Sequence, residues 1–65
     1  MKLSEFEIGD IVGGYGIVIE YLGPNGNFQK GKLISGKIGS YKAGVIIDTF
    51  NSDVDDWKLV QKANN

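Results

Sequence analysis

Short runs of alternating hydrophobic and polar residues, separated by glycine, extend along most of this chain. In residues 16–23 (GIVIEYLG), Ile17, Ile19 and Tyr21 fall on one side of a two-residue period. The other side of the same run carries Val18, Glu20 and Leu22. Because neighbouring side chains of a strand point to opposite faces, the run predicts a β-strand with one apolar face and one mixed face.

Residues 43–50 (AGVIIDTF) show the same period. Val45, Ile47 and Thr49 fall on one face, and the opposite face carries Ile46, Asp48 and Phe50. Weaker β-prone runs at residues 6–8, 32–38 and 57–62 complete a prediction of five short strands.

Glycine and small polar residues mark the connections between these strands. The chain holds ten glycines, and each Gly inside a helix costs about 1 kcal/mol relative to Ala, so no long helix is predicted. Pro24 and the pair Asn25-Gly26 predict a turn. Residues 51–56 predict a polar loop with one short helical turn, capped by Asp53, before the last strand. Residues 63–65 are predicted to be frayed.

The N-terminal segment has a second interpretation. Ser4 is followed three residues later by Glu7, which is the spacing of a helix capping box, and Gly9 limits any such helix to about one turn. The sequence favours the strand at residues 6–8 and leaves the one-turn helix as the alternative.

Five short strands in 65 residues predict an all-β fold, a small five-stranded antiparallel barrel that forms one domain over residues 1–65. A chain of about 60 residues buries only roughly 60% of its unfolded surface. This chain has no Cys and therefore no disulfide to add stability. Its stability must come from the apolar core that the alternating strands enclose.

The succession of these runs resembles Src-homology-3-like small barrels. The residues that carry the likeness are FEIGDIV, GYGIVIEYLG and AGVIIDTF, followed by a polar turn and a final strand at Trp57. The layout is similar to the KOW, Tudor and CAP-Gly members of that class, and the resemblance implies the fold. The ligand-binding Gly-Lys-Asn-Asp-Gly loop of CAP-Gly domains is missing after Asp48, so the resemblance implies no ligand. The aromatic residues that a Tudor-like platform or the core would use are Tyr15, Tyr21, Phe28, Tyr41 and Trp57.

Features missing from the sequence predict where in the cell the protein works. No segment approaches the roughly 20 apolar residues of a membrane span, no export signal is recognisable at the start, and Cys is absent. These features predict a cytoplasmic protein with no membrane partner. The chain also resembles the short barrels of bacteria and phages that act as adaptors or inhibitors.

The sequence predicts no enzyme, no cofactor and no metal site. His and Cys are both absent, which removes the usual general base and the best nucleophile. Residues 31–37 approach a phosphate-binding loop, but Ile38 replaces the Ser or Thr that binds magnesium, and Gly39 disfavours the helix that should follow. Residues 51–56 have oxygens at alternate positions, as calcium loops do, yet Asp56 and Lys62 stand at the sixth and twelfth positions, where Gly and Glu are needed.

The outer apolar face of the predicted barrel indicates a protein partner or self-association. If Ile17, Ile19, Val45 and Ile47 fill the barrel, four apolar residues must lie outside it, close to two acids. An uncovered cluster of this kind usually marks an interface. The predicted interface consists of Val18, Leu22, Ile46, Phe50, Glu20 and Asp48.

The alternative function is weak nucleic-acid binding. Residues 21–47 contain no acid, and lysines can neutralise phosphates there while aromatic rings stack on bases. The absence of Arg and an isoelectric point near 5.1 count against this function. The candidate residues are Lys30, Lys32, Lys37, Lys42, Phe28 and Tyr41.

Overall fold

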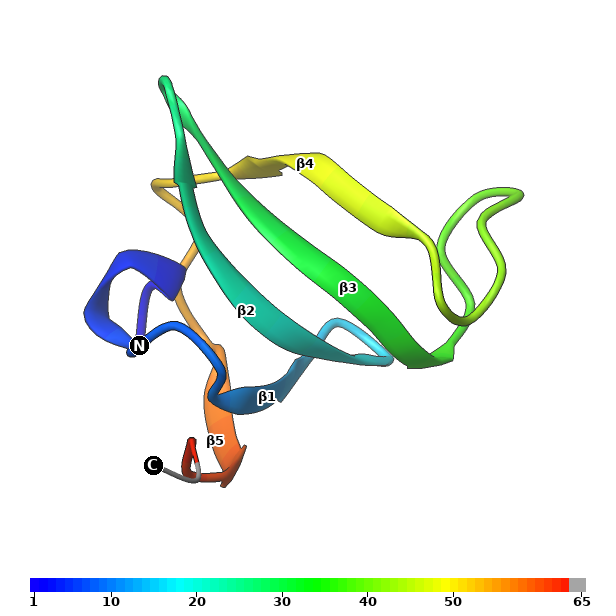
Figure 1. Ribbon diagram of the computed structural model, residues 1–65, viewed down its shortest axis with the longest axis horizontal. Coiled ribbons are helices and arrows are strands. Elements are labelled where there is room, and N and C mark those ends of the chain that lie inside the picture. Colours follow the sequence, from blue (N-terminus) through cyan, green and yellow to red (C-terminus); the bar gives the residue numbers. More distant parts are fainter. Residues whose placement is uncertain (64–65) are drawn as a thin grey trace.

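The computed structural model describes residues 1–63 and shows an all-β protein (Figure 1). A single 3-10 helix, η1 (Leu3–Glu5), precedes five strands among the described residues. The strands are β1 (Ile11–Gly14), β2 (Ile17–Asn25), β3 (Phe28–Gly36), β4 (Ile46–Asn51) and β5 (Lys58–Gln61). All neighbouring pairs are antiparallel, which confirms the prediction of an all-β fold with five antiparallel strands.

The strands form one sheet in the order β4-β3-β2-β1-β5. Strands β1 to β4 follow one another as a meander, and β5 returns to pair with β1. The two edge strands, β4 and β5, are not paired with each other, so the predicted barrel has no hydrogen-bonded closure over residues 1–63.

The prediction of a strand at residues 6–8 is wrong. This segment follows η1, whose N-cap residue Lys2 donates its backbone N–H to Glu5 Oε1 at 2.7 Å. The first strand begins only at Ile11. Phe6 is buried, whereas Ile8 is 64% exposed, so the two do not share a core-facing side. The alternative helix capped by Ser4 and Glu7 does not form either: the 3-10 turn begins earlier, at Leu3, has Lys2 at its N-cap and ends at Glu5.

Turn geometry sets the ends of the hairpins. Tyr15 and Gly16, between β1 and β2, both have positive φ (55° and 80°), as a type I′ turn requires. Gly26, with φ of 60°, opens the turn between β2 and β3. The predicted turn at Pro24 is therefore displaced, because Pro24 and Asn25 still pair as part of β2. No helical turn precedes β5, where residues 52–53 form a turn and residues 54–57 are irregular.

The hydrophobic core lies on one face of the sheet. Its members are Leu3, Phe6, Val12, Ile17, Ile19, Tyr21, Leu33, Ile47, Phe50 and Trp57. These include the Ile17, Ile19 and Ile47 predicted to fill the fold.

Strand β4 does not keep the predicted alternation. Val45 lies before the strand and is exposed, and Phe50 is buried with 8% exposure, so both assignments from the sequence are wrong. The pairing of β3 with β4 shifts between Gln29 and Gly31, and this irregularity leaves two exposed residues between Ile47 and Phe50.

A buried carboxylate holds the C-terminal segment to the N-terminal loop. Asp10 is 1% exposed, and its side chain accepts hydrogen bonds from the backbone N–H of Glu7 at 3.0 Å and of Ala63 at 2.7 Å. Lys62 Nζ lies 3.5 Å from the same carboxylate. Ala63 is therefore anchored rather than frayed, and the rest of the segment predicted to fray lies outside the described residues. Over the described chain, the structure contains no helix that is long and apolar enough to cross a membrane.

Candidate functional site

A pocket of about 200 Å³ opens beside the core, where the turn between β1 and β2 meets the loop between β4 and β5. Its wall is apolar and combines aromatic with aliphatic side chains from five parts of the chain. The lining residues are Tyr15, Ile17, Ile38, Phe50, Asn51, Val54 and Trp57.

Trp57 and Phe50 belong both to the core and to the pocket wall. Their rings are 5.8 Å apart with an interplanar angle of 89°, an edge-to-face contact. Trp57 is 3% exposed, and its Nε1 has no hydrogen-bond partner among the described residues. Unpaired buried donors are rare in folded proteins. This one belongs to a residue that links the core to the pocket wall.

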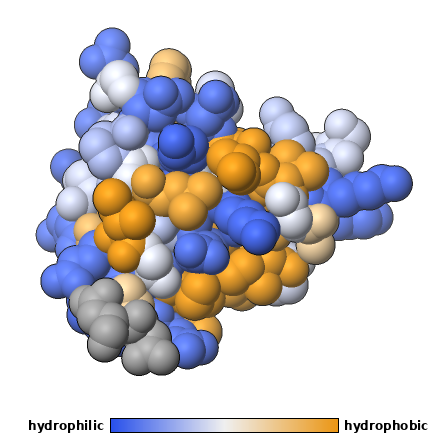
Figure 2. All heavy atoms as spheres, viewed as in Figure 1, coloured by the Kyte–Doolittle hydropathy of each residue, from blue (hydrophilic) through white to orange (hydrophobic). Residues whose placement is uncertain are grey.

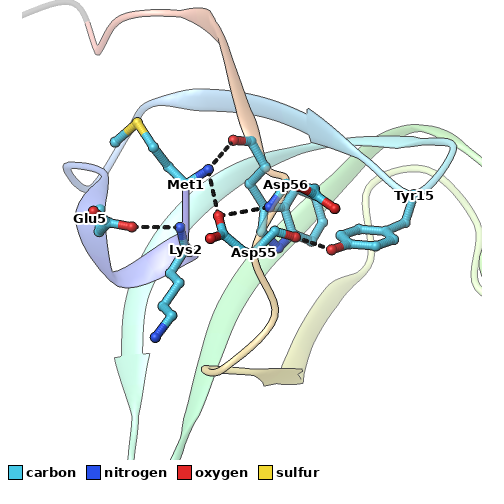
Figure 3. Close-up of polar contacts among 7 residues, drawn as sticks. Met1, Lys2, Glu5, Tyr15, Asp55 and Asp56 are labelled. Atoms are coloured by element: carbon cyan, nitrogen blue, oxygen red, sulfur yellow. Dashed lines mark hydrogen bonds and ion pairs between the residues drawn. The ribbon is translucent and has the colours of Figure 1, made fainter.

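Tyr15 covers one side of Trp57 from an unusual backbone conformation. Its ring meets that of Trp57 edge-on at 5.3 Å, and its hydroxyl donates a hydrogen bond to the Asp55 carbonyl (Figure 3). A positive φ is unfavourable for a bulky residue, so these contacts offset a local backbone cost. Partial desolvation, together with the nearby charges of Asp56 and Asp55, raises the pKa of the Tyr15 phenol above its ordinary value of 10.0.

Three acidic residues of the loop between β4 and β5 are sequence neighbours of the lining residues Val54 and Trp57. They are called here the acidic rim and are Asp53, Asp55 and Asp56. Of the three, Asp55 is the one whose carboxylate has partners within the chain: its Oδ1 accepts the Asp56 N–H at 2.8 Å and lies 2.9 Å from the Met1 amino group (Figure 3). The hydrogen bond from that amino group is the main cause that lowers the pKa of Asp55 below 3.8. Asp53 and Asp56 are exposed, and within residues 1–63 their carboxylates make no ion pair.

The predicted calcium-like loop uses its oxygens to shape the backbone. The side-chain oxygen of Asn51 accepts the Asp53 N–H at 2.8 Å, an Asx turn that bends the chain after β4. Asp53 therefore does not cap a helical turn.

Residues 37–45, between β3 and β4, form a protruding segment, called here the basic loop (Figure 1). Its tip is closed by a bridge between Ile38 and Tyr41, in which the Tyr41 N–H donates to the Ile38 carbonyl at 3.1 Å. Ile38 is half-buried and lines the pocket, whereas Tyr41 is 47% exposed. Lys37 and Lys42 flank them and are exposed.

The residues of the predicted protein interface are only partly brought together. Val18, Glu20 and Leu22 are half-buried on the face of β2 opposite the core. Glu20 pairs with Lys32, and Lys32 with Ile46, so these three residues form a row across β2, β3 and β4. Ile46 and Asp48 are exposed. The prediction is wrong for Phe50, which belongs to the core.

Hydrophilic side chains interrupt the apolar surface on one face of the molecule. Figure 2 shows one face of the molecule, on which hydrophobic side chains gather in separate groups with hydrophilic ones between them. The row through Glu20, Lys32 and Ile46 mixes both kinds in the same way. Binding of a partner at this face stays a prediction from the sequence.

The predicted nucleic-acid residues do not form one surface. Phe28 opens β3, with Lys30 and Lys32 following in the strand, whereas Lys37, Tyr41 and Lys42 belong to the basic loop beyond its other end. The eight steps from Phe28 to Gly36 span roughly 26 Å along the strand. Nucleic-acid binding through the whole segment stays a prediction.

The aromatic residues that the sequence suggested for a platform or for the core are divided among three places. Of the five candidate aromatics, only Tyr15 and Trp57 meet at the pocket; Tyr21 is in the core, and Phe28 and Tyr41 are exposed elsewhere. The signal for Tyr15 was available, because an aromatic residue enclosed by glycines in GGYG marks a tight turn that must expose it. Ile38 and Val54 carry no comparable signal.

No protein-family model matches this chain, and no curated protein or solved structure is detectably similar to it.

Proposed function

We propose that this chain is a small non-enzymatic protein-binding module whose pocket receives one apolar side chain of a partner polypeptide. The observation that carries the proposal is an apolar, partly aromatic pocket that opens beside an acidic rim. Pockets for drug-sized ligands measure about 300–1,000 Å³. The volume here, about 200 Å³, suits a single side chain better than a cofactor or an extended small molecule.

The walls of the pocket favour recognition over chemistry. Aromatic side chains supply large contact areas at a low entropic cost and are enriched at binding interfaces. Tyr15 brings the only titratable side chain among the lining residues, and its hydroxyl is already bonded to Asp55. The exposed carboxylates of Asp53 and Asp56 lie outside the lining, where they contribute to orientation and specificity.

We also propose that the open sheet belongs to the Src-homology-3-like class of small barrels. Two features support this assignment: four strands form a meander, and the fifth returns beside the first. The contact of Phe50 in β4 with Trp57, which directly precedes β5, joins the two edges through side chains rather than backbone. A role as a cytoplasmic adaptor or inhibitor in a bacterium or phage extends the same proposal.

Selection of peptides from a displayed random library tests the binding function. We expect selected peptides to share one large apolar residue, and to lose at least about tenfold in affinity for Val54→Asp, because a buried charge in the pocket is unfavourable. Val45→Asp is the matched control, since Val45 is exposed outside the pocket. Peptides that bind the wild type and Val54→Asp equally well would refute a pocket-based function.

A further inference from the structure

The basic loop presents an aromatic side chain to solvent. Tyr41 is 47% exposed at the end of a two-residue tip that the bridge to Ile38 holds in place. The segment extends from the sheet (Figure 1) and contributes only Ile38 to the partly buried layer around the core. A fixed, exposed aromatic residue on a protruding segment is the form of side chain that an apolar pocket accepts.

The charges around Tyr41 are opposite to those around the pocket. Lys37 and Lys42 flank Tyr41, and neither makes an ion pair within the described chain. Asp53 and Asp56 at the acidic rim are likewise without an ion pair there. Two exposed cations in the basic loop and two exposed anions in the acidic rim are complementary in number and sign.

The position of the basic loop determines which kind of assembly suits these two surfaces. Ile38 lines the pocket and is bridged to Tyr41, so the segment that carries the exposed aromatic side chain also contributes to the pocket wall. When two complementary surfaces are adjacent, a twofold rotation brings each to its counterpart in one closed contact.

From these observations we infer that the occupant of the pocket is a second copy of this chain. In a twofold dimer, Tyr41 of each copy enters the pocket of the other, and Lys37 and Lys42 face the partner's acidic rim. The inference rests on the proposed function, because it names the partner of the same pocket.

The size of the molecule sets the strength of such a dimer. An interface of standard size buries about 800 Å² per partner. That is about a fifth of the 4211 Å² surface of this chain. A contact made by one loop and one pocket is smaller, so the dimer is reversible and forms at micromolar or higher concentration. Since Lys37 and Lys42 of one copy, and Asp53 and Asp56 of the other, are exposed, added salt weakens the dimer.

Analytical ultracentrifugation at low salt, about 50 mM, tests the inference when the protein concentration is raised to about 1 mM. We expect the mass to rise from that of one 7.1 kDa chain towards twice that value. Tyr41→Ser should weaken association at least about tenfold, as loss of a central aromatic contact does. Phe28→Ser is the matched control, because Phe28 has the same 47% exposure but lies at the opposite end of β3.

A charge exchange tests the arrangement itself. The variant Lys37→Glu/Lys42→Glu and the variant Asp53→Lys/Asp56→Lys should each remain monomeric, since like charges then meet at both contacts. Mixed in equal amounts, they should form a heterodimer, because both contacts again join opposite charges. Failure of the mixture to associate, when both variants are folded, would overturn the reciprocal arrangement.

The two proposals fail in different ways. A wild type that stays monomeric at low salt refutes self-association, whereas peptides that still require Val54 keep the binding module intact. If the peptides bind Val54→Asp as tightly as the wild type, and Tyr41→Ser dimerises as strongly as the wild type, both proposals are refuted.

Discussion

At the scale of the residue, Gly36 shows how tightly β3 and β2 approach each other. A Cβ at this position would lie 2.3 Å from the carbonyl oxygen of Gly16 and 2.8 Å from Cα of Ile17. Both atoms belong to the backbone, so neither moves without displacing the hairpin. The φ of Gly36, 94°, is also one that L side chains avoid.

We therefore expect Gly36→Ala to lower the free energy of unfolding by about 3 kcal/mol or more, since a steric clash adds to backbone strain. Gly44→Ala is the control, because Gly44 has nearly the same φ, 95°, and nothing within 4 Å of the added carbon. That variant should lose only about 1–2 kcal/mol. Urea unfolding measures both values, and equal losses would show that backbone strain alone sets the cost.

Asp10 makes the free energy of unfolding depend on pH in the acidic range. The backbone N–H groups of Ala63 and Glu7 are the leading causes that lower the pKa of its carboxyl below 3.8, and Lys62 adds to them. When folding lowers the pKa of a carboxyl, the carboxylate stabilises the folded state at every pH above the pKa that it has in the unfolded chain. This stabilisation is lost as the pH falls through the pKa that the carboxyl has in the folded chain.

We expect Asp10→Asn to lower the urea midpoint of unfolding at neutral pH. On acidification to about pH 3, the variant should lose less stability than the wild type does, because it has no carboxyl to protonate at this position. Asp48→Asn should follow the wild type at both pH values, because the exposed Asp48 carboxylate makes no hydrogen bond or ion pair with residues 1–63. A wild type and an Asp10→Asn variant with parallel acid profiles would contradict this role for Asp10.

At the scale of the elements, a chain of side-chain hydrogen bonds ties β2, β3 and the loop after β4 together. The Tyr21 hydroxyl donates to Gln29 Oε1, and Gln29 Nε2 donates to Ser52 Oγ at 3.0 Å. Ser52 in turn donates to the Asn27 carbonyl at 2.9 Å. Gln29 is 5% exposed and Tyr21 is 3% exposed, so both depend on these partners.

Gln29→Leu should lower the free energy of unfolding by about 1–3 kcal/mol, because it leaves the buried Tyr21 hydroxyl without a partner. Adding Tyr21→Phe should recover part of that loss, since removing both members of a hydrogen bond costs less than removing one. Chemical denaturation of the two single variants and the double variant measures this coupling. Strictly additive losses would show that the bond between Tyr21 and Gln29 contributes little.

At the scale of the whole molecule, the proposed dimer links stability to concentration. Association that is specific to the folded chain stabilises it by mass action. We expect Tm to rise by a few degrees for each tenfold increase in wild-type concentration at low salt, once the dimer is populated. Tyr41→Ser should show a concentration-independent Tm. Calorimetry makes the measurement, and a wild-type Tm that ignores concentration would speak against a folded dimer.

Local alternation in the sequence determined the class of fold and the strongest strand. The two-residue period of residues 17–23 gives a burial pattern that alternates through β2. Periodicity also placed Ile47 inside and Ile46 outside. These assignments need only local geometry, because the direction of a side chain along a regular strand follows from its position.

The tertiary structure decided what depends on contacts between distant residues. The irregular pairing of β3 with β4 buried Phe50 and exposed Asp48 and Thr49 together, a shift that one strand's own sequence does not encode. The hydrogen bond from Ala63 to Asp10 anchored a segment that looked free, across 53 positions of sequence. The pocket likewise joins residues from Tyr15 to Trp57, so its existence depends on how the sheet brings its turns and loops together.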